Sequence, residues 1–263
     1  MMTRNRMTTS LGNKRQKTLA GLIIVVTALM FTSCAKDQWF DFAKRAGNTV
    51  TINRPVSSNF TKIYLNDDVD LIITQGNTYS ITLTGGENLL PGIETSISDS
   101  ALSISNTNTF NWLRSYDNKI TAYVTLPHML ILNYEATSTV TNLDTIREDS
   151  LAISATGGSG YIKLKIITKL AHLSIAGGCS VDMDIMGKSG LNFISSFGYG
   201  PFHCRNLKTV YTYIATNSTN DCYINVSHRL EYTISNLGNI YYFGDIAEIK
   251  GITTGEGKLI KSE

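Results

Sequence analysis

Hydrophobic and polar residues alternate in short runs along most of this chain, with a period of two. From residue 131 onwards, a small polar turn interrupts the alternation about every 20 residues. The turns are EATSTV (135–140), SATGGSG (154–160), SIAGGCS (174–180), ISSFGYG (194–200), IATNSTN (214–220), ISNLGNI (234–240) and ITTGEGK (252–258). Units this short have no room for an ordinary helix and cannot bury an apolar face alone, so they must stack. The pattern predicts an all-β fold, with a parallel β-solenoid of one coil per repeat over residues 131–263.

Residues 48–130 also read as strands but lack the regular repeat of the later part. Alternating or apolar runs lie at 69–75, 79–85, 92–98, 101–105 and 119–127. Turn residues such as Gly85-Gly86 and Asp99-Ser100 separate them. An uncapped solenoid end would expose unpaired strand edges. We therefore expect 48–130 to be an irregular β region that caps the solenoid.

Residues 1–33 have the composition of an export signal. They contain five basic residues and no acid, and they include an uncharged, mainly apolar run at 19–31. A membrane-spanning helix needs about 20 apolar residues, so this shorter run is typical of a secretory signal. The sequence FTSC (31–34) resembles a bacterial lipobox. The resemblance implies cleavage before Cys34, acylation of Cys34, and a membrane-anchored tether over 34–47; the alternative is an exported protein whose Cys34 has no lipid.

Removal of the signal changes the charge balance. The whole chain has 23 basic and 21 acidic residues, and five of the basic residues lie in the signal, which leaves 18 against 21. The mature chain is therefore slightly acidic. Nothing in it suggests nucleic-acid binding.

The tripeptide GKS at 187–189 matches the end of a phosphate-binding loop. Such a loop needs another glycine five residues earlier, and it lies between a strand and a helix. Asp182 occupies the position of that glycine, and the next segment, LNFISSF, reads as a strand. We expect GKS to be a solvated corner of a coil rather than a nucleotide site.

Asp182 and Asp184 could be a pair of carboxylates for acid–base chemistry. They alternate with apolar residues, so both should point outwards. One coil earlier, 19 residues before each acid, Lys163 should lie beside Asp182 and Lys165 beside Asp184, and one coil later His203 and Arg205 point outwards. Opposite charges on neighbouring strands stabilise each other by about 0.2–1 kcal/mol per pair. We favour an outward charge ladder over a catalytic pair.

Other chemistry-bearing residues form no recognisable site. Cys204 and Cys222 are separated by almost one coil and could be free thiols or a disulfide. No C-x-x-C, H-x-x-x-H, G-x-S-x-G or H-E-x-x-H motif occurs, so no metal, cofactor or nucleophile is predicted. Tyrosines crowd residues 211–242, where they could stack on sugars or simply pack over the sheet. Basic residues at coil corners could meet an anionic glycan or a partner subunit, or serve solubility; they are Lys169, Lys188, Lys208, Arg229 and Lys250.

Residues 60–105 resemble the head GIN domain of putative autotransporter adhesins, found in lipoproteins of Bacteroides-like bacteria. The matching features are F-x-K-I at 60–63, V-D-L-x-I-x-Q-G at 69–76, E-N-L-L at 87–90 and the Gly158-Ser159-Gly160 centre. The resemblance spans about residues 48–258. It implies a right-handed parallel β-helix similar to pectate-lyase-like folds, without a shared catalytic set, and adhesion as the role. The later centres SFG, NST and NLG depart from Gly-Ser-Gly.

Three short stretches resemble the O-glycosylation sequon of the same bacteria, Asp-Ser/Thr-aliphatic. They imply Ser100, Thr145 and Ser150 as candidate acceptors. The sequon is only three positions long, so it can also arise without modification.

The sequence therefore predicts a non-enzymatic outer-membrane lipoprotein, at the cell surface or on the periplasmic face. The expected role is an adhesin that binds a glycan or a protein partner, with self-association open. The alternatives are a polysaccharide-active β-helix enzyme, because fold does not determine function, and a periplasmic scaffold protein.

Overall fold

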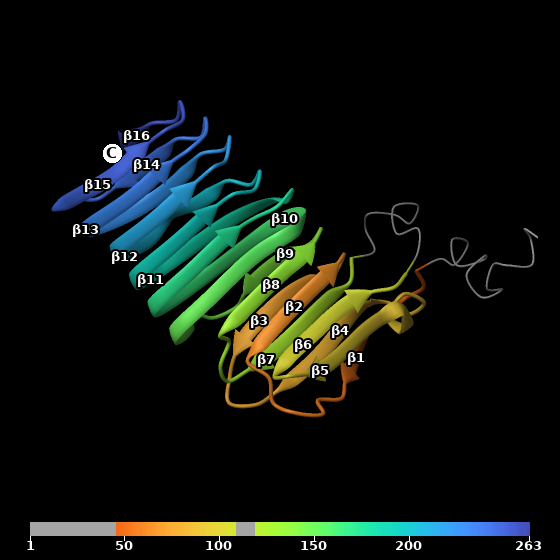
Figure 1. The fold of residues 1–263 in the computed structure, drawn as a ribbon. Coiled ribbons are helices and arrows are strands. Elements are labelled where there is room, and N and C mark those ends of the chain that lie inside the picture. The colour runs from red at the N-terminus through yellow and green to blue at the C-terminus, as the bar shows by residue number, and fades with distance from the viewer. Residues whose placement is uncertain (1–45, 109–118) are drawn as a thin grey trace, which may run out of the picture. The chain divides into compact units, whose positions relative to one another are not determined.

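The computed structural model describes residues 46–108 and 119–263. The expected signal segment 1–33, Cys34 and most of the tether therefore lie outside the described residues. The described chain is nearly all β and forms a solenoid of about six turns with a repeat of about 21 residues (Figure 1). The predicted fold class is confirmed.

Short strands make up the first part of the chain, and the second part contains four long strands followed by three short ones. The first part contains β1 (Thr49–Arg54), β2 (Lys62–Asp67), β3 (Asp70–Gln75), β4 (Ser80–Gly86), the 3-10 turn η2 (Leu90–Gly92), β5 (Ile93–Ser98), β6 (Ala101–Asn106), β7 (Thr121–Leu126), β8 (Ile131–Ala136) and β9 (Thr139–Asn142). The second part contains β10 (Ile146–Ile175), β11 (Ser180–Ser196), β12 (Phe202–Thr216), β13 (Cys222–Ile234), β14 (Ile240–Phe243), β15 (Glu248–Thr253) and β16 (Leu259–Lys261).

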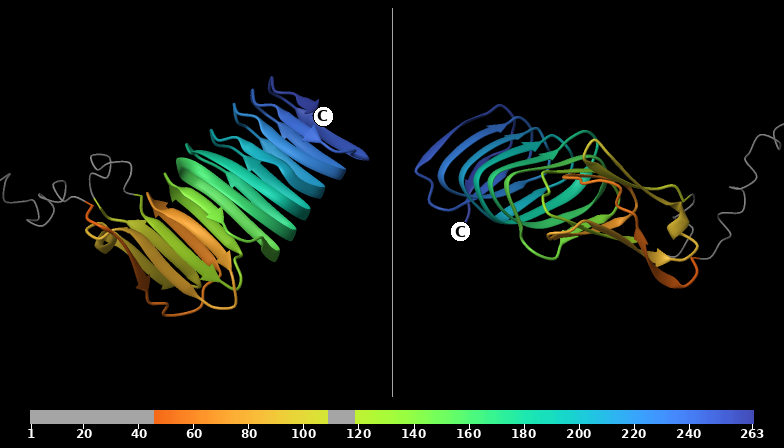
Figure 2. Two further views of the ribbon diagram at one scale, coloured as in Figure 1. Left: turned by 180° about the vertical axis from the view of Figure 1, so that it is seen from behind. Right: turned by 90° about the horizontal axis from the view of Figure 1, so that it is seen from below.

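From β10 onwards the coils stack in chain order, and all of these pairings are parallel. Figure 2 shows consecutive coils lying over one another. Ser159 pairs with Ser180, one full repeat further along the chain. The step is two residues shorter near the C-terminus, where Arg229 pairs with Glu248. Register shifts in the β11–β12 and β12–β13 pairings absorb the difference.

The core follows directly from the alternation. In β11, Val181, Met183 and Ile185 are fully buried, while the residues between them face outwards. Burying one such aliphatic side chain contributes about 1.5–3 kcal/mol. Each coil repeats this arrangement, so one continuous apolar core runs through the stack.

The N-terminal coils do not follow chain order. β2 pairs with both β6 and β8, and β3 pairs with both β7 and β9, always in parallel. The coil made by β2 and β3 therefore lies between the β6–β7 coil, which comes later in the sequence, and the β8–β9 coil. The alternation of side chains reports which face is buried, not which strand is the neighbour, so the sequence pattern did not show this order.

Antiparallel strands flank the first coils, in the region where the sequence predicted a cap. β4 pairs antiparallel with β7 and with β1, and β5 pairs antiparallel with β6. The Arg54 guanidinium ties β1 to the turn after β4, because it donates to the carbonyls of Leu90 and Ile93 at 2.9 and 2.8 Å.

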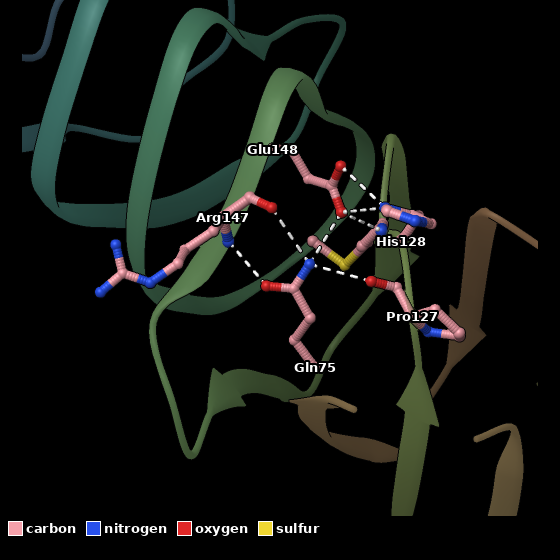
Figure 3. Close-up of polar contacts among 6 residues, drawn as sticks. Gln75, Pro127, His128, Arg147 and Glu148 are labelled. Carbon is pink, nitrogen blue, oxygen red and sulfur yellow. Dashed lines mark hydrogen bonds and ion pairs between the residues drawn. The ribbon is translucent and has the colours of Figure 1, made fainter. Parts of the chain in front are cut away.

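A polar cluster joins the segment between β7 and β8 to the end of β3 and the start of β10 (Figure 3). The Gln75 Nε2 atom lies 2.9 Å from the Pro127 carbonyl, 3.1 Å from the Arg147 carbonyl and 2.9 Å from Glu148 Oε1. Its Oε1 atom accepts from the Arg147 amide at 2.7 Å. Glu148 Oε1 also accepts from the Met129 amide at 3.1 Å. One glutamine thus joins three coils where the chain departs from sequential order.

We expect Gln75→Ala to lower the free energy of unfolding by about 2 kcal/mol, because several net hydrogen bonds of about 1 kcal/mol each are lost. Chemical denaturation would measure the change. The matched control is Glu94→Ala, which removes an exposed side chain from β5 and should stay within about 0.5 kcal/mol of wild type. Equal stability of the two variants would contradict a clamping role for Gln75.

Candidate functional site

Two outward faces of the coils carry the chemistry-bearing side chains. The first, which we term the ladder face, consists of Lys163, Asp184, His203, Tyr223 and Tyr241, which follow one another in backbone register on β10 to β14. Tyr161 and Asp182 flank it. Because they alternate with buried residues, all of these side chains leave the core side of the strand.

Asp184 is held by two neighbours from the preceding coil. Lys163 Nζ lies 3.8 Å from Asp184 Oδ2, and the Tyr161 hydroxyl donates to the same oxygen at 2.9 Å. Burial, followed by the contact with Asp184, raises the pKa of Tyr161 to about 12. The sequence predicted a step of 19 residues between these coils, which would pair Lys163 with Asp182. The observed register places Lys163 beside Asp184 instead.

Asp182 meets the following coil. His203 Nε2 lies 3.3 Å from Asp182 Oδ1, within ion-pair distance but without hydrogen-bond alignment. Burial raises the pKa of Asp182 above its ordinary value, and Asp184 adds to this, while His203 opposes it. The two acids thus have separate basic partners and do not converge on one substrate position.

The other two ladder candidates lie apart from the acids. Lys165 pairs by backbone with Met186, and its amide and carbonyl are both bound by the Asn142 side chain at 2.9 and 2.8 Å. The Arg205 guanidinium lies 4.2 Å from the centre of the Phe243 ring and donates to the Glu263 carbonyl at 2.9 Å. Beyond His203 the ladder face is aromatic: His203 stacks on Tyr223 at 5.5 Å, and Tyr223 on Tyr241 at 5.0 Å.

A groove occupies the second outward face. The sequence did not predict this groove. It has a volume of about 430 Å³ and spans β11, β12, β13 and β15. Three adjacent columns line it: Phe193, Tyr213, Glu231 and Lys250; Ile194, Ile214, Tyr232 and Gly251; and Ser195, Ala215, Thr233 and Ile252. One signal in the sequence could have revealed the aromatic column: Phe193 and Tyr213 each come directly before the turn of their coil, at 194–200 and 214–220.

Four charged residues form a network beside the groove, and two of them, Glu231 and Lys250, line it. Arg229 contacts Glu231, and it lies 3.3 Å from Glu248. Lys250 Nζ lies 2.6 Å from Glu248, and its hydrogen bond is the main cause that lowers the pKa of Glu248. Two of the predicted basic corner residues therefore belong to a charge-balanced network.

The remaining corner residues form no uniform basic stripe. Lys169 Nζ pairs with Asp149 at 2.9 Å, whereas Lys188 and Lys208 are exposed neighbours in register. Ser189 of the GKS tripeptide is buried, accepts from the Thr168 hydroxyl at 3.0 Å and donates to the Leu191 carbonyl. β11 continues through GKS without a helix, so the arrangement is a coil corner and not a phosphate-binding loop.

The three cysteines of the described chain, Cys179, Cys204 and Cys222, are buried free thiols. Cys222 pairs in register with Phe202, and Cys204 with Ile224. Diagonal neighbours of this kind are about 7–8 Å apart between Cα atoms, which is beyond ordinary disulfide reach. Burial is also the main cause that raises the pKa of both Cys204 and Cys222, the latter to about 11.

We expect Cys179, Cys204 and Cys222, in a folded Cys34→Ala variant, to react with a thiol reagent such as dithionitrobenzoate only after denaturation. Burial blocks access and disfavours the thiolate, which is the reactive form. The raised pKa of Cys222 also makes the stability of the protein depend on pH. Unfolding returns this pKa from about 11 to its ordinary 9.0, so deprotonation of the thiol favours the unfolded state. The free energy of unfolding is therefore unaffected below pH 9 and falls as the pH rises towards 11. Fast labelling of the native protein at pH 8 would contradict the buried-thiol arrangement.

The candidate acceptors for O-glycosylation lie at different exposures. Ser100 is exposed in the β5–β6 turn, where its φ is +59°, and Ser150 is exposed in β10. Thr145 is half-buried. Within residues 46–108 and 119–263 no cluster of three potential metal ligands occurs. The same residues contain no helix long and apolar enough to cross a membrane.

A stack of β-coils, each of which contacts only its neighbours, defines a repeat protein of the solenoid class. The chain belongs to the family described as "Putative auto-transporter adhesin, head GIN domain", whose model matches residues 59–245. No curated protein matches it at a significant level.

Solved structures of bacterial proteins share the fold. A putative adhesin from Bacteroides fragilis is 17% identical, with a TM-score of 0.74, and the match covers 82% of this chain and 97% of that one. A putative adhesin from Parabacteroides distasonis is 15% identical, with a TM-score of 0.65 and coverage of 82% and 98%. A putative lipid binding protein from the same species is 15% identical, with a TM-score of 0.57 and the same coverage. At these identities the likeness concerns the fold.

Proposed function

We propose that the protein is a non-enzymatic adhesin of the outer membrane, anchored through a lipid on Cys34, that binds a surface glycan or a protein partner. The observation that carries the proposal is the groove with its aromatic wall on the outward face of four successive coils. The family's description as an adhesin supports it. The FTSC sequence at 31–34 supports export and lipid attachment.

The ladder face argues against the alternative of a polysaccharide-active enzyme. A glycoside hydrolase usually aims two carboxyl groups at one bond, whereas Asp182 and Asp184 face different partners. Turnover of acidic glycans that is lost in both Asp182→Asn and Asp184→Asn would reverse this preference.

Protease treatment of intact cells tests the proposed location and role. We expect the chain to be cleaved while a periplasmic control protein stays intact, and a deletion strain to lose adherence to glycan- or protein-coated surfaces. Survival of the chain until the outer membrane is opened would overturn the adhesin proposal in favour of a periplasmic scaffold. Unchanged membrane association of a Cys34→Ala variant would overturn the lipid anchor.

A further inference from the structure

The groove combines the features of a binding site for an extended ligand. Its four coils, spaced by about 4.8 Å, give it a length of about 14 Å. Its volume of about 430 Å³ falls within the range of about 300–1,000 Å³ that is usual for ligand sites. It runs across the strands, so a chain-like ligand could enter and leave at either end.

Tyr213 offers an aromatic face within the groove. Its ring stacks on Phe193 at 5.2 Å and 21°, and Phe193 stacks on His172 at 4.9 Å. The next position in register is Glu231, which carries no ring and turns to Arg229. The ring stack of the described chain therefore ends at Tyr213, and the face of Tyr213 opposite Phe193 has no ring on it. Tyr223 differs, because rings cover both of its faces.

The floor beside Tyr213 consists of small side chains and ends at the exposed Ile252. Ala215 follows Ser195 in register, and Thr233 follows Ala215. Ser195 and Thr233 bring hydroxyl groups, which both donate and accept hydrogen bonds. Gly251 adds no side chain, and a Cβ there would lie 2.2 Å from the Tyr232 carbonyl oxygen and 2.5 Å from the Tyr232 ring. The small side chains of Ser195, Ala215 and Thr233 leave the groove open beside Tyr213.

The charges of the groove wall cancel. Glu231 and Glu248 are matched by Arg229 and Lys250 in one connected network. An anionic ligand would have to compete with Glu248 for both bases, and a cationic one with Arg229 for Glu231. A neutral ligand rich in hydroxyl groups can instead hydrogen-bond to the outer edges of these groups without breaking the pairs.

We propose that this groove binds an uncharged glycan, with one sugar ring packed against the part of the Tyr213 ring that lines the groove and its hydroxyls bonded to Glu231, Lys250 and Thr233. Sugar rings present C–H groups on one face and hydroxyls at the rim, which fits an aromatic wall beside paired charges. The inference rests on the proposed adhesin function and names the ligand class of its groove.

Binding of the full-length lipidated protein in detergent to immobilised oligosaccharides tests the inference. The neutral probes are maltohexaose, mannohexaose and cellohexaose, and the anionic probe is an oligogalacturonate. We expect binding to at least one neutral probe, little dependence on salt, and about tenfold weaker binding by Tyr213→Ala because the stacking contact is lost. Tyr213→Phe keeps the ring and should retain most of the affinity.

Tyr223→Ala is the matched control, because it removes an outward tyrosine of the ladder face whose ring faces are already covered; it should bind as wild type does. Thr233→Gln fills the floor without touching the core, so it tests the groove if Tyr213→Ala fails to fold. Neutral binding that is unchanged in Tyr213→Ala and Thr233→Gln would overturn the groove assignment while leaving the adhesin proposal standing. Preference for the anionic probe, or no binding to any probe, would overturn the ligand class. Adherence of whole cells then decides separately whether the adhesin function stands.

Discussion

Replacement of Gly158 by alanine should destabilise the solenoid by about 3 kcal/mol, the combined cost of backbone strain and a steric clash. Gly158 has a φ of +77°, which disfavours any residue with a Cβ. An added Cβ would also lie 1.9 Å from the Ala136 carbonyl oxygen of the preceding coil. That oxygen belongs to the β8 backbone and cannot move without disturbing the β8–β10 pairing.

Thermal unfolding provides the measurement. A loss of about 3 kcal/mol corresponds to a fall in Tm of about 6–12 °C for a domain of this size. Gly178→Ala is the control, because an added Cβ there meets nothing within 4 Å. A Gly158→Ala variant with the melting temperature of Gly178→Ala would show that residues 158–160 of β10 tolerate another conformation.

Phe202→Ala should cost about 3–5 kcal/mol, the range for removing a buried aromatic side chain. Phe202 is fully buried, and its backbone pairs with Met183 on one side and Cys222 on the other. The surrounding side chains come from separate strands joined by a continuous ladder, so they cannot all collapse into the space that the ring leaves.

Denaturant titration measures the free energy of unfolding of Phe202→Ala and of the control Phe197→Ala. The comparison separates the loss of a buried ring from the loss of any phenylalanine. Phe197 lies in the turn after β11 and is 50% exposed, so its removal should change the free energy of unfolding by about 0.5 kcal/mol or less. Similar losses for both variants would mean that the coil of β12 is not packed as described.

The ladder face illustrates how a small error in register changes a site. The alternation in residues 181–185 correctly placed both acids outwards, because a two-residue period follows from strand geometry. The partner of each acid depends on the length of the preceding coil, and a change of two residues moved Lys163 from Asp182 to Asp184. The β10–β11 pairing keeps a step of 21 residues along its whole length, without a register shift, so only the strand pairing shows how long that coil is.

The sequence by itself determined the all-β class, the stacking of coils from residue 131 onwards, the inward and outward faces, and the coil corner at GKS. These properties are local, because they depend on side-chain alternation and on turn residues. The tertiary structure alone decided the insertion of the β2–β3 coil between β6–β7 and β8–β9, the Gln75 clamp and the groove. Each of these depends on which strands become neighbours, and that choice is made by packing between residues as far apart as Gln75 and Glu148, over distances at which alternation carries no information.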